Sequence, residues 1–208
     1  MLSVRGLRRE YDGRTVLSVE EWDVPQGEAS LVIGSSGSGK STLLAIIAGL
    51  LSATAGSVKV GDTEVTKLAP AERDRFRARS IGLVPQTLHL IGVLTVRENL
   101  GLARDVAGLA ADPGAIDGAM AALGIGELAA RRAAHLSVGE AQRTAVARAV
   151  VNRPRLILAD EPTAALDDDN CERALALLRD QAKACGATLV VATHDRRLLP
   201  HFSRTLAL

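Results

Sequence analysis

Residues 34–42 read Gly34-Ser35-Ser36-Gly37-Ser38-Gly39-Lys40-Ser41-Thr42, the G-x-x-x-x-G-K-[ST] pattern of a phosphate-binding loop. An apolar run, residues 31–33, precedes the loop and an apolar helical pattern follows it, so the loop is expected between a buried strand and a helix. Glycines let backbone N–H groups close around a polyphosphate, and the positive end of the helix dipole faces the same charge. A flexible Gly/Ser linker would need neither the Lys-Ser-Thr sequence nor the apolar helix. The motif therefore predicts binding of a nucleoside triphosphate.

Two side chains of this loop are expected to act on the charged end of the nucleotide. Lys40 supplies a positive charge for the outer phosphates, and the Ser41 hydroxyl is placed to bind Mg²⁺. The predicted nucleotide-binding residues of the loop are Gly34, Ser35, Ser36, Gly37, Ser38, Gly39, Lys40, Ser41 and Thr42.

A second motif reads Arg155-Leu156-Ile157-Leu158-Ala159-Asp160-Glu161-Pro162. It is an apolar strand that ends in two carboxylates, and open α/β sheets bind their ligands at that edge. Asp160 can hold Mg²⁺ directly or through water, and Glu161 can orient or deprotonate an attacking water. A solvated turn after a strand is the alternative interpretation, but the phosphate loop upstream favours the catalytic one. The pair therefore predicts hydrolysis of the nucleotide rather than its storage.

Length and composition are those of one compact domain. The chain has 208 residues, enough to bury a sizeable core, and a formal net charge of +1, which gives no strong field for nucleic acid or acidic lipid. The two cysteines lack metal-ligand spacing. No signal peptide is visible at the start, and the most apolar stretch, residues 43–51, is far shorter than the roughly 20 residues that cross a bilayer. We therefore expect a cytoplasmic protein that another chain would have to hold at a membrane.

Apolar runs without alternation recur at wide spacing, at residues 31–33, 81–84, 156–159 and 188–192. Such runs are typical of strands buried on both faces of a parallel sheet. Helical patterns lie between them, at residues 40–51, 138–152 and 170–184. Residues 16–24 and 57–61 predict further strands, with Val16, Trp22 and Val24 on one side of the first. The predicted fold class is an α/β core with antiparallel strands at the front, and the stretch from residue 87 to 132 is expected to be a helical insertion.

Further short motifs follow one another in a fixed order. Residues 136–140 read Leu136-Ser137-Val138-Gly139-Glu140, which is similar to a Leu-Ser-Gly-Gly-Gln signature, and Ser137 lies 23 residues before Asp160. The other matches are Tyr11 (an adenine-stacking aromatic residue), Gln86 (the Q-loop), Ala165-Leu166-Asp167 (the D-loop) and His194 (the switch histidine). With these motifs the chain resembles the nucleotide-binding subunits of ATP-binding-cassette (ABC) transporters from about residue 2 to residue 208.

The resemblance implies a fold and a way of working. The fold would be a phosphate-loop NTPase with a RecA-like parallel sheet, an N-terminal antiparallel β subdomain and an α-helical subdomain at about residues 87–140, all in one domain of residues 1–208. The cofactors would be ATP and Mg²⁺. Two copies would pack head to tail, each ATP lying between the phosphate loop of one copy and the signature of the other. The remaining partner would be a polytopic membrane subunit, and the location the cytoplasmic face of a bacterial inner membrane, with no nucleic acid expected.

The resemblance also assigns roles to residues outside the two phosphate motifs. Glu161, His194 and Gln86 would be catalytic, and Mg²⁺ would be held by Ser41, Gln86 and Asp160. Further nucleotide contacts would come from Tyr11, Ser137, Gly139, Glu140 and Asp167.

The signature departs from the family pattern at two positions. Glu140 in place of Gln keeps the local helix start, because Ser137 and Glu140 form a capping-box pattern. Val138 in place of Gly adds a side chain at a close approach and removes access to positive φ. We expect function to be retained.

Several alternatives stay open at this stage. Tyr11 could be a surface aromatic residue in a turn, and His194 could be a helix N-cap. The apolar stretch of residues 87–99 could form a groove for a helix of the membrane subunit or the core of the helical insertion. The sequence of residues 159–167 most resembles subunits of the lipoprotein-release and macrolide-export type. A soluble ABC-type ATPase acting on ribosomes or nucleic acid is the alternative function, and a small-molecule kinase or GTPase is disfavoured because it would lack the signature.

Overall fold

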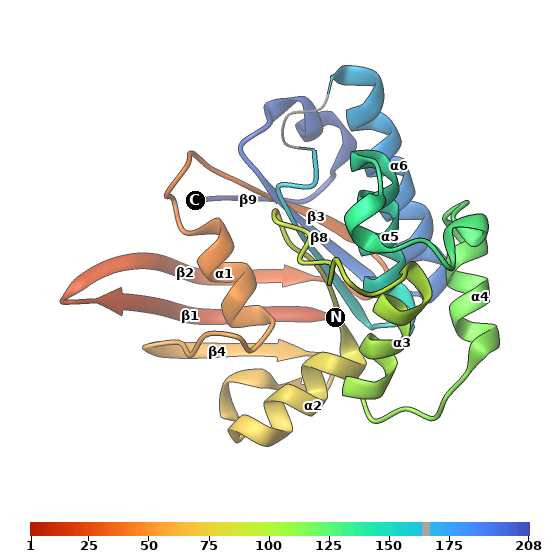
Figure 1. Cartoon of the computed structure of the whole chain (residues 1–208). Coiled ribbons are helices and arrows are strands. Elements are labelled where there is room, and N and C mark those ends of the chain that lie inside the picture. Colours follow the sequence, from red (N-terminus) through yellow and green to blue (C-terminus); the bar gives the residue numbers. More distant parts are fainter. Residues whose placement is uncertain (164–166) are drawn as a thin grey trace.

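The computed structural model describes residues 1–163 and 167–208, and it contains an antiparallel and a parallel sheet (Figure 1). The antiparallel sheet has the order β2-β1-β4-β5, and the parallel sheet has the order β6-β7-β8-β3-β9. The strands are β1 Leu2–Tyr11, β2 Arg14–Val24, β3 Ala29–Ile33, β4 Ala55–Val60, β5 Thr63–Glu64, β6 Ile81–Val84, β7 Leu156–Asp160, β8 Thr188–Thr193 and β9 Thr205–Ala207. The predicted α/β class with antiparallel strands at the front is confirmed.

Helices cover both faces of the parallel sheet. They are α1 Lys40–Ile47, α2 Pro70–Ser80, α3 Val96–Val106, α4 Pro113–Ala122, α5 Val138–Val150 and α6 Asp168–Cys185. Helix α1 contacts β7 and β8 and lies between the two sheets, whereas α5 and α6 stand beside the other face of the parallel sheet (Figure 1). Short 3₁₀ turns, at Gly126–Leu128, Ala133–His135 and Arg196–His201, lie between the longer elements.

The continuous apolar runs of the parallel strands divide between two hydrophobic clusters. Leu156 and Leu158 of β7 pack with α1 and the antiparallel sheet, whereas Ile157 packs with α5 and α6. Val190 and Val191 of β8 divide in the same way. Because successive side chains of a strand point to opposite faces, burial on both faces requires an unbroken apolar run. For this physical reason, the unbroken apolar runs in the sequence predict these strands.

Strand β2 differs from the prediction at its start. Trp22 and Val24 are buried as expected, but Val16 is only half-buried, and Leu17 and Val19 are buried in its place. The alternation of buried and exposed residues along β2 shifts by one residue opposite Gly6 of β1. Gly6 has a φ of 53° and lies where the pairing of β1 with β4 shifts register. Such an irregularity twists the strand and turns its side chains to the other face. The expectation that Val16, Trp22 and Val24 share one side is therefore wrong.

The sequence pattern does not predict β1 or α2. Helix α2 has no buried residue, so it carries no apolar stripe that a periodicity could detect. Its Pro70 at the first turn and Glu72 at N3 are the local features that start it. Among the described residues, no helix has the length and apolar character that crossing a membrane requires.

Helices α3 and α4 form the expected helical insertion between β6 and α5. Their buried residues Leu100 and Met120 belong to the same hydrophobic cluster as Val146 and Val150 of α5. The insertion therefore packs on α5 rather than on the antiparallel sheet. The division into one domain with a helical unit at about residues 87–140 stays a prediction.

Asn99 of α3 joins the start of this insertion to the preceding loop. Its side chain is 1% exposed, and its Oδ1 accepts a hydrogen bond from the N–H of Ile91 at 2.9 Å. Its Nδ2 donates to the carbonyls of Ile91, Leu94 and Thr95 at 3.2, 3.4 and 3.0 Å. The three carbonyls also accept backbone N–H groups, so among the described residues the Ile91 N–H is the backbone group that depends on this buried amide alone.

Replacing this amide should destabilise the fold. We expect Asn99→Ala to lower the free energy of unfolding by about 1–3 kcal/mol, because it leaves the Ile91 N–H without a partner and removes the donor bonds of a buried amide. Urea denaturation measures the change. Asp105→Ala, at an exposed position of the same helix, is the control and should change it by less than about 0.5 kcal/mol. An Asn99→Ala chain as stable as the control would contradict this account of the loop.

Candidate functional site

The phosphate loop connects β3 to α1, as the sequence predicts. Gly39 is the N-cap of α1 with a φ of 98°, and a Cβ built on it would lie 2.7 Å from the carbonyl oxygen of Val16. Gly37 also has a positive φ, 80°. Only glycine adopts these conformations without strain, so the loop can wrap with its backbone N–H groups turned inward at the positive end of α1.

Lys40 holds its charge inside the loop. Its side chain is 6% exposed, and its Nζ donates to the carbonyls of Gly34 and Ser35, each at 2.9 Å. The same Nζ lies 3.6 Å from Oε1 of Glu161. A buried ammonium with carbonyl and carboxylate partners is a preformed positive centre for an anion that enters the loop.

Asp160 ends β7 beside this centre, and its environment fits a cation. Burial raises the pKa of Asp160, and this effect is opposed by a hydrogen bond with the Ser41 side chain and by the charge of Lys40. Its Oδ1 is buried without a hydrogen-bond partner among the described residues. A carboxylate oxygen without a partner next to a serine hydroxyl is the donor set that Mg²⁺ prefers, so Asp160 and Ser41 fit the predicted metal.

Glu161 is the most constrained residue of the site. It has a φ of 49°, unusual for a residue other than glycine, and its N–H donates to the carbonyl of Ala192 at 2.7 Å. Its carboxylate accepts a hydrogen bond from the Thr193 hydroxyl at 2.8 Å and lies 2.9 Å from Nδ1 of His194. Burial by itself would raise the pKa of Glu161, but the hydrogen bonds from His194 and Thr193 and the charge of Lys40 outweigh it, so the pKa is lowered. Glu161 is therefore ionised at neutral pH and able to accept a proton.

These groups meet at one cavity of about 440 Å³. Its lining combines the antiparallel sheet, the phosphate loop and the ends of the parallel strands: Tyr11, Val16, Ser36, Gly37, Gly39, Lys40, Ser41, Thr42, Gln86, Glu161 and His194. Gly34, Ser35 and Ser38 belong to the loop beneath the lining, and Asp160 precedes Glu161. Val16 was not predicted as a site residue; it lies here because the alternation of β2 slips, which no local pattern reveals.

Tyr11 stands at the rim of this cavity. Its side chain is 45% exposed, and the guanidinium carbon of Arg9 lies 4.3 Å from its ring centroid. An exposed ring backed by a cation is held in place and still able to stack on a planar ligand.

No signature residue lines this cavity, although Val138 lines a smaller neighbouring cavity of about 130 Å³ together with Gln86 and Glu161. Ser137 is the N-cap of α5, and its N–H and Oγ donate to Oε2 of Glu140 at 2.8 and 2.9 Å, so the predicted capping box is present. The other carboxylate oxygen of Glu140 accepts a hydrogen bond from Arg131 at 3.0 Å. Ser137, Gly139 and Glu140 are not among the residues that line the cavity.

Val138 causes no backbone strain, although it lacks the access to positive φ that glycine would have. It is the first helical residue of α5, it is absent from the residues with positive φ, and its side chain is 78% exposed. The loss of glycine's conformational freedom is therefore harmless at this position.

The structure shows the local contacts of Asp167 and His194. The side chain of Asp167 caps α6 by accepting from the N–H of Asn170 at 2.9 Å, while Ala165 and Leu166 lie outside the described residues. The N-cap of the turn after β8 is Asp195, not His194. The capping interpretation of His194 is therefore wrong, and its ring faces Glu161 instead.

Comparisons with known proteins agree with this arrangement. The model of the family described as "ABC transporter" matches residues 17–164. The lipoprotein-releasing system ATP-binding protein LolD 1 of Caulobacter vibrioides is 38% identical over 100% of this chain and 92% of its own length. An uncharacterized ABC transporter ATP-binding protein of Mycobacterium tuberculosis is 37% identical over 94% of this chain and 79% of its own length.

A solved structure gives the same result for the fold. The dimeric structure of MJ0796, described as a bacterial ABC transporter cassette, has a TM-score of 0.88 and 32% identity, and it covers 100% of this chain and 94% of its own. A second structure of that protein is described as a post-hydrolysis dimer bound to ADP and Pi, with the same score.

Removing the charge of Lys40 tests the site. We expect Lys40→Met to weaken MgATP binding about 100-fold or more, because a buried charge that faces the phosphates is lost. Isothermal titration calorimetry measures the affinity, and circular dichroism checks that the chain is folded. Lys59→Met, on β4 outside the cavity, is the control and should bind like the parent. Parental affinity in Lys40→Met would contradict the assignment of the phosphate loop.

Proposed function

The chain belongs to the ABC transporter family as an ATP-binding and ATP-hydrolysing subunit, and from this premise we propose that two copies enclose two MgATP molecules. Each nucleotide would lie between the phosphate loop of one copy and the signature, residues 136–140, of the other. Family membership rests on the match of residues 17–164 and on relatives that are similar over the whole chain.

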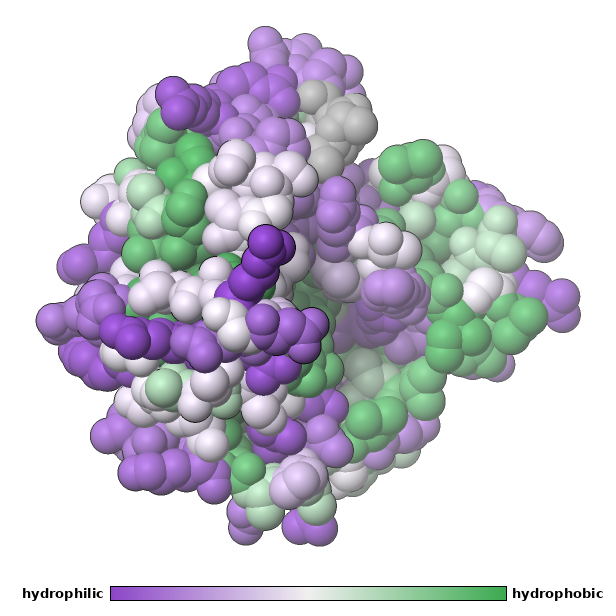
Figure 2. Space-filling model, turned by 90° about the vertical axis from the view of Figure 1, so that its left-hand side faces the viewer, coloured by the Kyte–Doolittle hydropathy of each residue, from purple (hydrophilic) through white to green (hydrophobic). Residues whose placement is uncertain are grey.

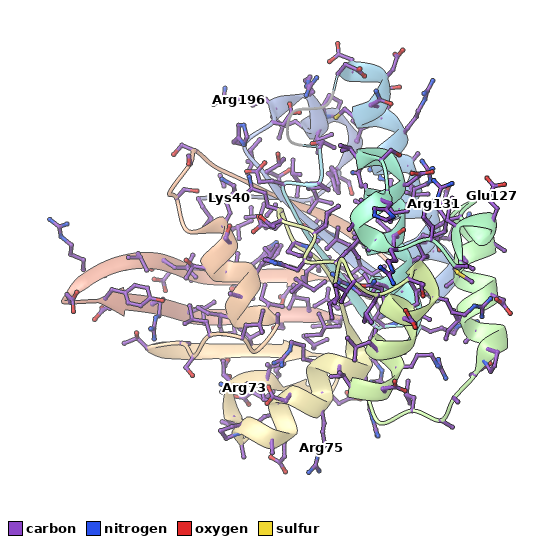
Figure 3. All side chains as sticks on the ribbon, viewed as in Figure 1. Lys40, Arg73, Arg75, Glu127, Arg131 and Arg196 are labelled. Carbon is purple, nitrogen blue, oxygen red and sulfur yellow. The ribbon has the colours of Figure 1, made fainter. Side chains whose placement is uncertain are left out.

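One observation carries the proposal: the cavity brings together the predicted nucleotide residues of the phosphate loop but none of the signature. Figure 3 supports this separation, because Lys40 lies at the start of α1 and Arg131, which bonds to Glu140 of the signature, lies well apart from it. This separation favours a signature that acts on the ATP held by another copy. Dimeric cassettes among the similar structures are consistent with this arrangement.

Within one copy the residues divide the chemistry. Lys40 neutralises the outer phosphates, and Tyr11 stacks on the base with little base-specific hydrogen bonding. Ser41, Asp160 and Gln86 would hold Mg²⁺, which supplies charge stabilisation at the phosphates when bound. Glu161 accepts a proton from the attacking water, since its carboxylate is ionised and lines the cavity. His194 orients that carboxylate through Nδ1 and is placed to sense the terminal phosphate.

From the partner copy, Ser137 and Gly139 would approach the terminal phosphate at the positive end of α5, with Glu140 holding the helix start. Asp167 would face the partner across the same junction.

A second cavity supports docking of a polytopic membrane subunit. It has a volume of about 370 Å³ and lies between α2, α3 and α5. Its lining includes apolar side chains that are exposed: Leu50, Ile91, Leu102 and Val106. Exposed apolar residues gathered in one groove are typical of a contact site, here for a short helix of the membrane subunit. Figure 2 shows how another face of the molecule combines hydrophilic surface with hydrophobic patches, separated by a hollow.

The location follows from this partner. We place the chain on the cytoplasmic face of a bacterial inner membrane, held there by the membrane subunit. The resemblance to LolD proteins, named for a lipoprotein-releasing system, favours a transporter of that type. The relatives named above are ATP-binding proteins of transporters, which favours this function over a soluble ATPase acting on ribosomes or nucleic acid.

Replacing Glu161 separates binding from chemistry. We expect Glu161→Gln to bind MgATP but to hydrolyse it at least about 100-fold more slowly, because the proton acceptor is lost. The variant should therefore accumulate as an ATP-bound dimer, seen as a doubled mass by light scattering. Parental turnover in Glu161→Gln would remove Glu161 from the catalytic residues.

Replacing Ser137 tests the shared site. We expect Ser137→Arg to bind nucleotide as a monomer almost like the parent, while dimerisation and hydrolysis are blocked by a bulky side chain at the junction. Loss of the N-cap should cost only about 1 kcal/mol, so the variant should fold. Light scattering and an ATPase assay measure both effects.

Mixing experiments provide the control for this variant. Ser137→Arg mixed with Lys40→Ala should restore one intact ATP site per heterodimer and partial activity at best. If Ser137→Arg alone is a competent ATPase at low protein concentration, catalysis is contained within one copy and the proposal fails.

A further inference from the structure

The segment that carries Gln86 is weakly supported by regular structure. Residues 85–94, between β6 and α3, contain no helix and no strand. Gln86 is exposed and lines the nucleotide cavity, and its side chain makes no hydrogen bond among the described residues. His89 has a φ of 47°, a conformation that persists only where the surroundings hold it. The position of Gln86 therefore depends on whatever fixes the backbone beside it.

Arg148 of α5 fixes that backbone. Its Nη1 donates to the carbonyl of His89 and its Nη2 to the carbonyl of Leu88, both at 2.6 Å. Within the part of the chain that the structure describes, these are the only hydrogen bonds to the backbone between Pro85 and Leu90. The next hydrogen bonds to this segment are those of the Asn99 side chain, and the first residue that they reach is Ile91.

The setting of Arg148 is unfavourable for a residue with only a packing role. Burial lowers the pKa of Arg148, which reflects the cost of removing a guanidinium from water. Among the described residues it forms no ion pair with a carboxylate, so the two carbonyls are its compensation. An apolar side chain would fill this half-buried place at lower cost, so the guanidinium with its two carbonyl partners indicates a geometric role.

We propose that Arg148 is a positioning residue for ATP hydrolysis, which holds Gln86 at the cavity by fixing the backbone at Leu88 and His89. The planar guanidinium suits this task, because two parallel donors set both the distance and the direction of the segment. The inference rests on the proposed role of Gln86 toward the metal. It adds to that role by naming Arg148 of α5 as the residue on which the position of Gln86 depends.

Arg148→Met tests the inference, because it keeps an apolar stem and removes both donors. We expect kcat to fall about tenfold or more while the KM for ATP and the Kd of MgATP change less than about twofold, since Gln86 acts on hydrolysis rather than on initial binding. Arg148→Lys keeps the charge without the two-donor fork and should have an intermediate kcat.

Arg104→Met is the matched control. Arg104 of α3 has a side chain that is 12% exposed, and it also donates to carbonyls, those of Val151 and Ala110 at 3.4 and 3.1 Å. It makes no hydrogen bond to residues 85–90. Arg104→Met should therefore lose a comparable amount of stability but keep the parental kcat. An equal fall of kcat in both variants would reduce Arg148 to a structural residue and overturn the inference.

A double-mutant cycle with Gln86→Ala shows whether Arg148 acts through Gln86. The Arg148→Met change should lower kcat less than about twofold in the Gln86→Ala background. Additive losses, or a parental kcat in Arg148→Met, would overturn the inference and leave the proposed function standing. A parent chain that neither dimerises nor hydrolyses ATP would instead overturn the proposed function, and this inference with it.

Discussion

The parallel backbone ladder that joins β8 to β7 on one side and to β3 on the other is the constraint on which the site depends. It sets Asp160 opposite Ala192 and Ile33 opposite Thr193, so three strands end at one level. From those ends the chain continues into the phosphate loop, Glu161 and His194. Parallel pairing requires long crossovers, and this is why segments far apart in sequence share one edge. A slip of one residue would turn these side chains to the opposite faces and separate Glu161 from its partners.

Electrostatics then gives two adjacent carboxylates different properties. Burial raises the pKa of Asp160, and one of its oxygens has no partner among the described residues, so its ionised form is best stabilised by a cation. Glu161 has a lowered pKa because Thr193, His194 and Lys40 surround it. Neighbouring acids whose environments separate their pKa values usually take different chemical roles. The positive φ of Glu161 is consistent with this division, because it turns this carboxylate away from the direction that a regular strand would give it.

The sequence predicts those parts of the structure that depend on local pattern. The phosphate loop, the strands buried on both faces and the capping box at Ser137 and Glu140 each follow from residues close together in the chain. The remaining features arise from contacts between distant segments or from the absence of a pattern. Val16 reaches the cavity through an irregularity opposite Gly6, and α2 has no buried face to detect. Thr193 and the ring of His194 contact Glu161 because β7 pairs with β8. The sequence shows only that a residue with a hydroxyl group precedes the motif histidine, which does not predict this contact.

Helix α5 shows how such distant contacts create a mechanical connection. It begins after Ser137, its Gln142 donates to the carbonyl of Pro162 at 2.8 Å, and its Arg148 holds Leu88 and His89. Ser137 and Arg148 are eleven residues apart, about 16 Å along a helix that behaves as a rigid rod on this scale. The residue after Glu161 and the segment after Gln86 are therefore attached to the element whose first turn would face the partner's nucleotide. In the proposed dimer, a shift of the helix on contact at that turn would act on both attachments, and these bonds would then make the proposed catalytic groups sensitive to the partner.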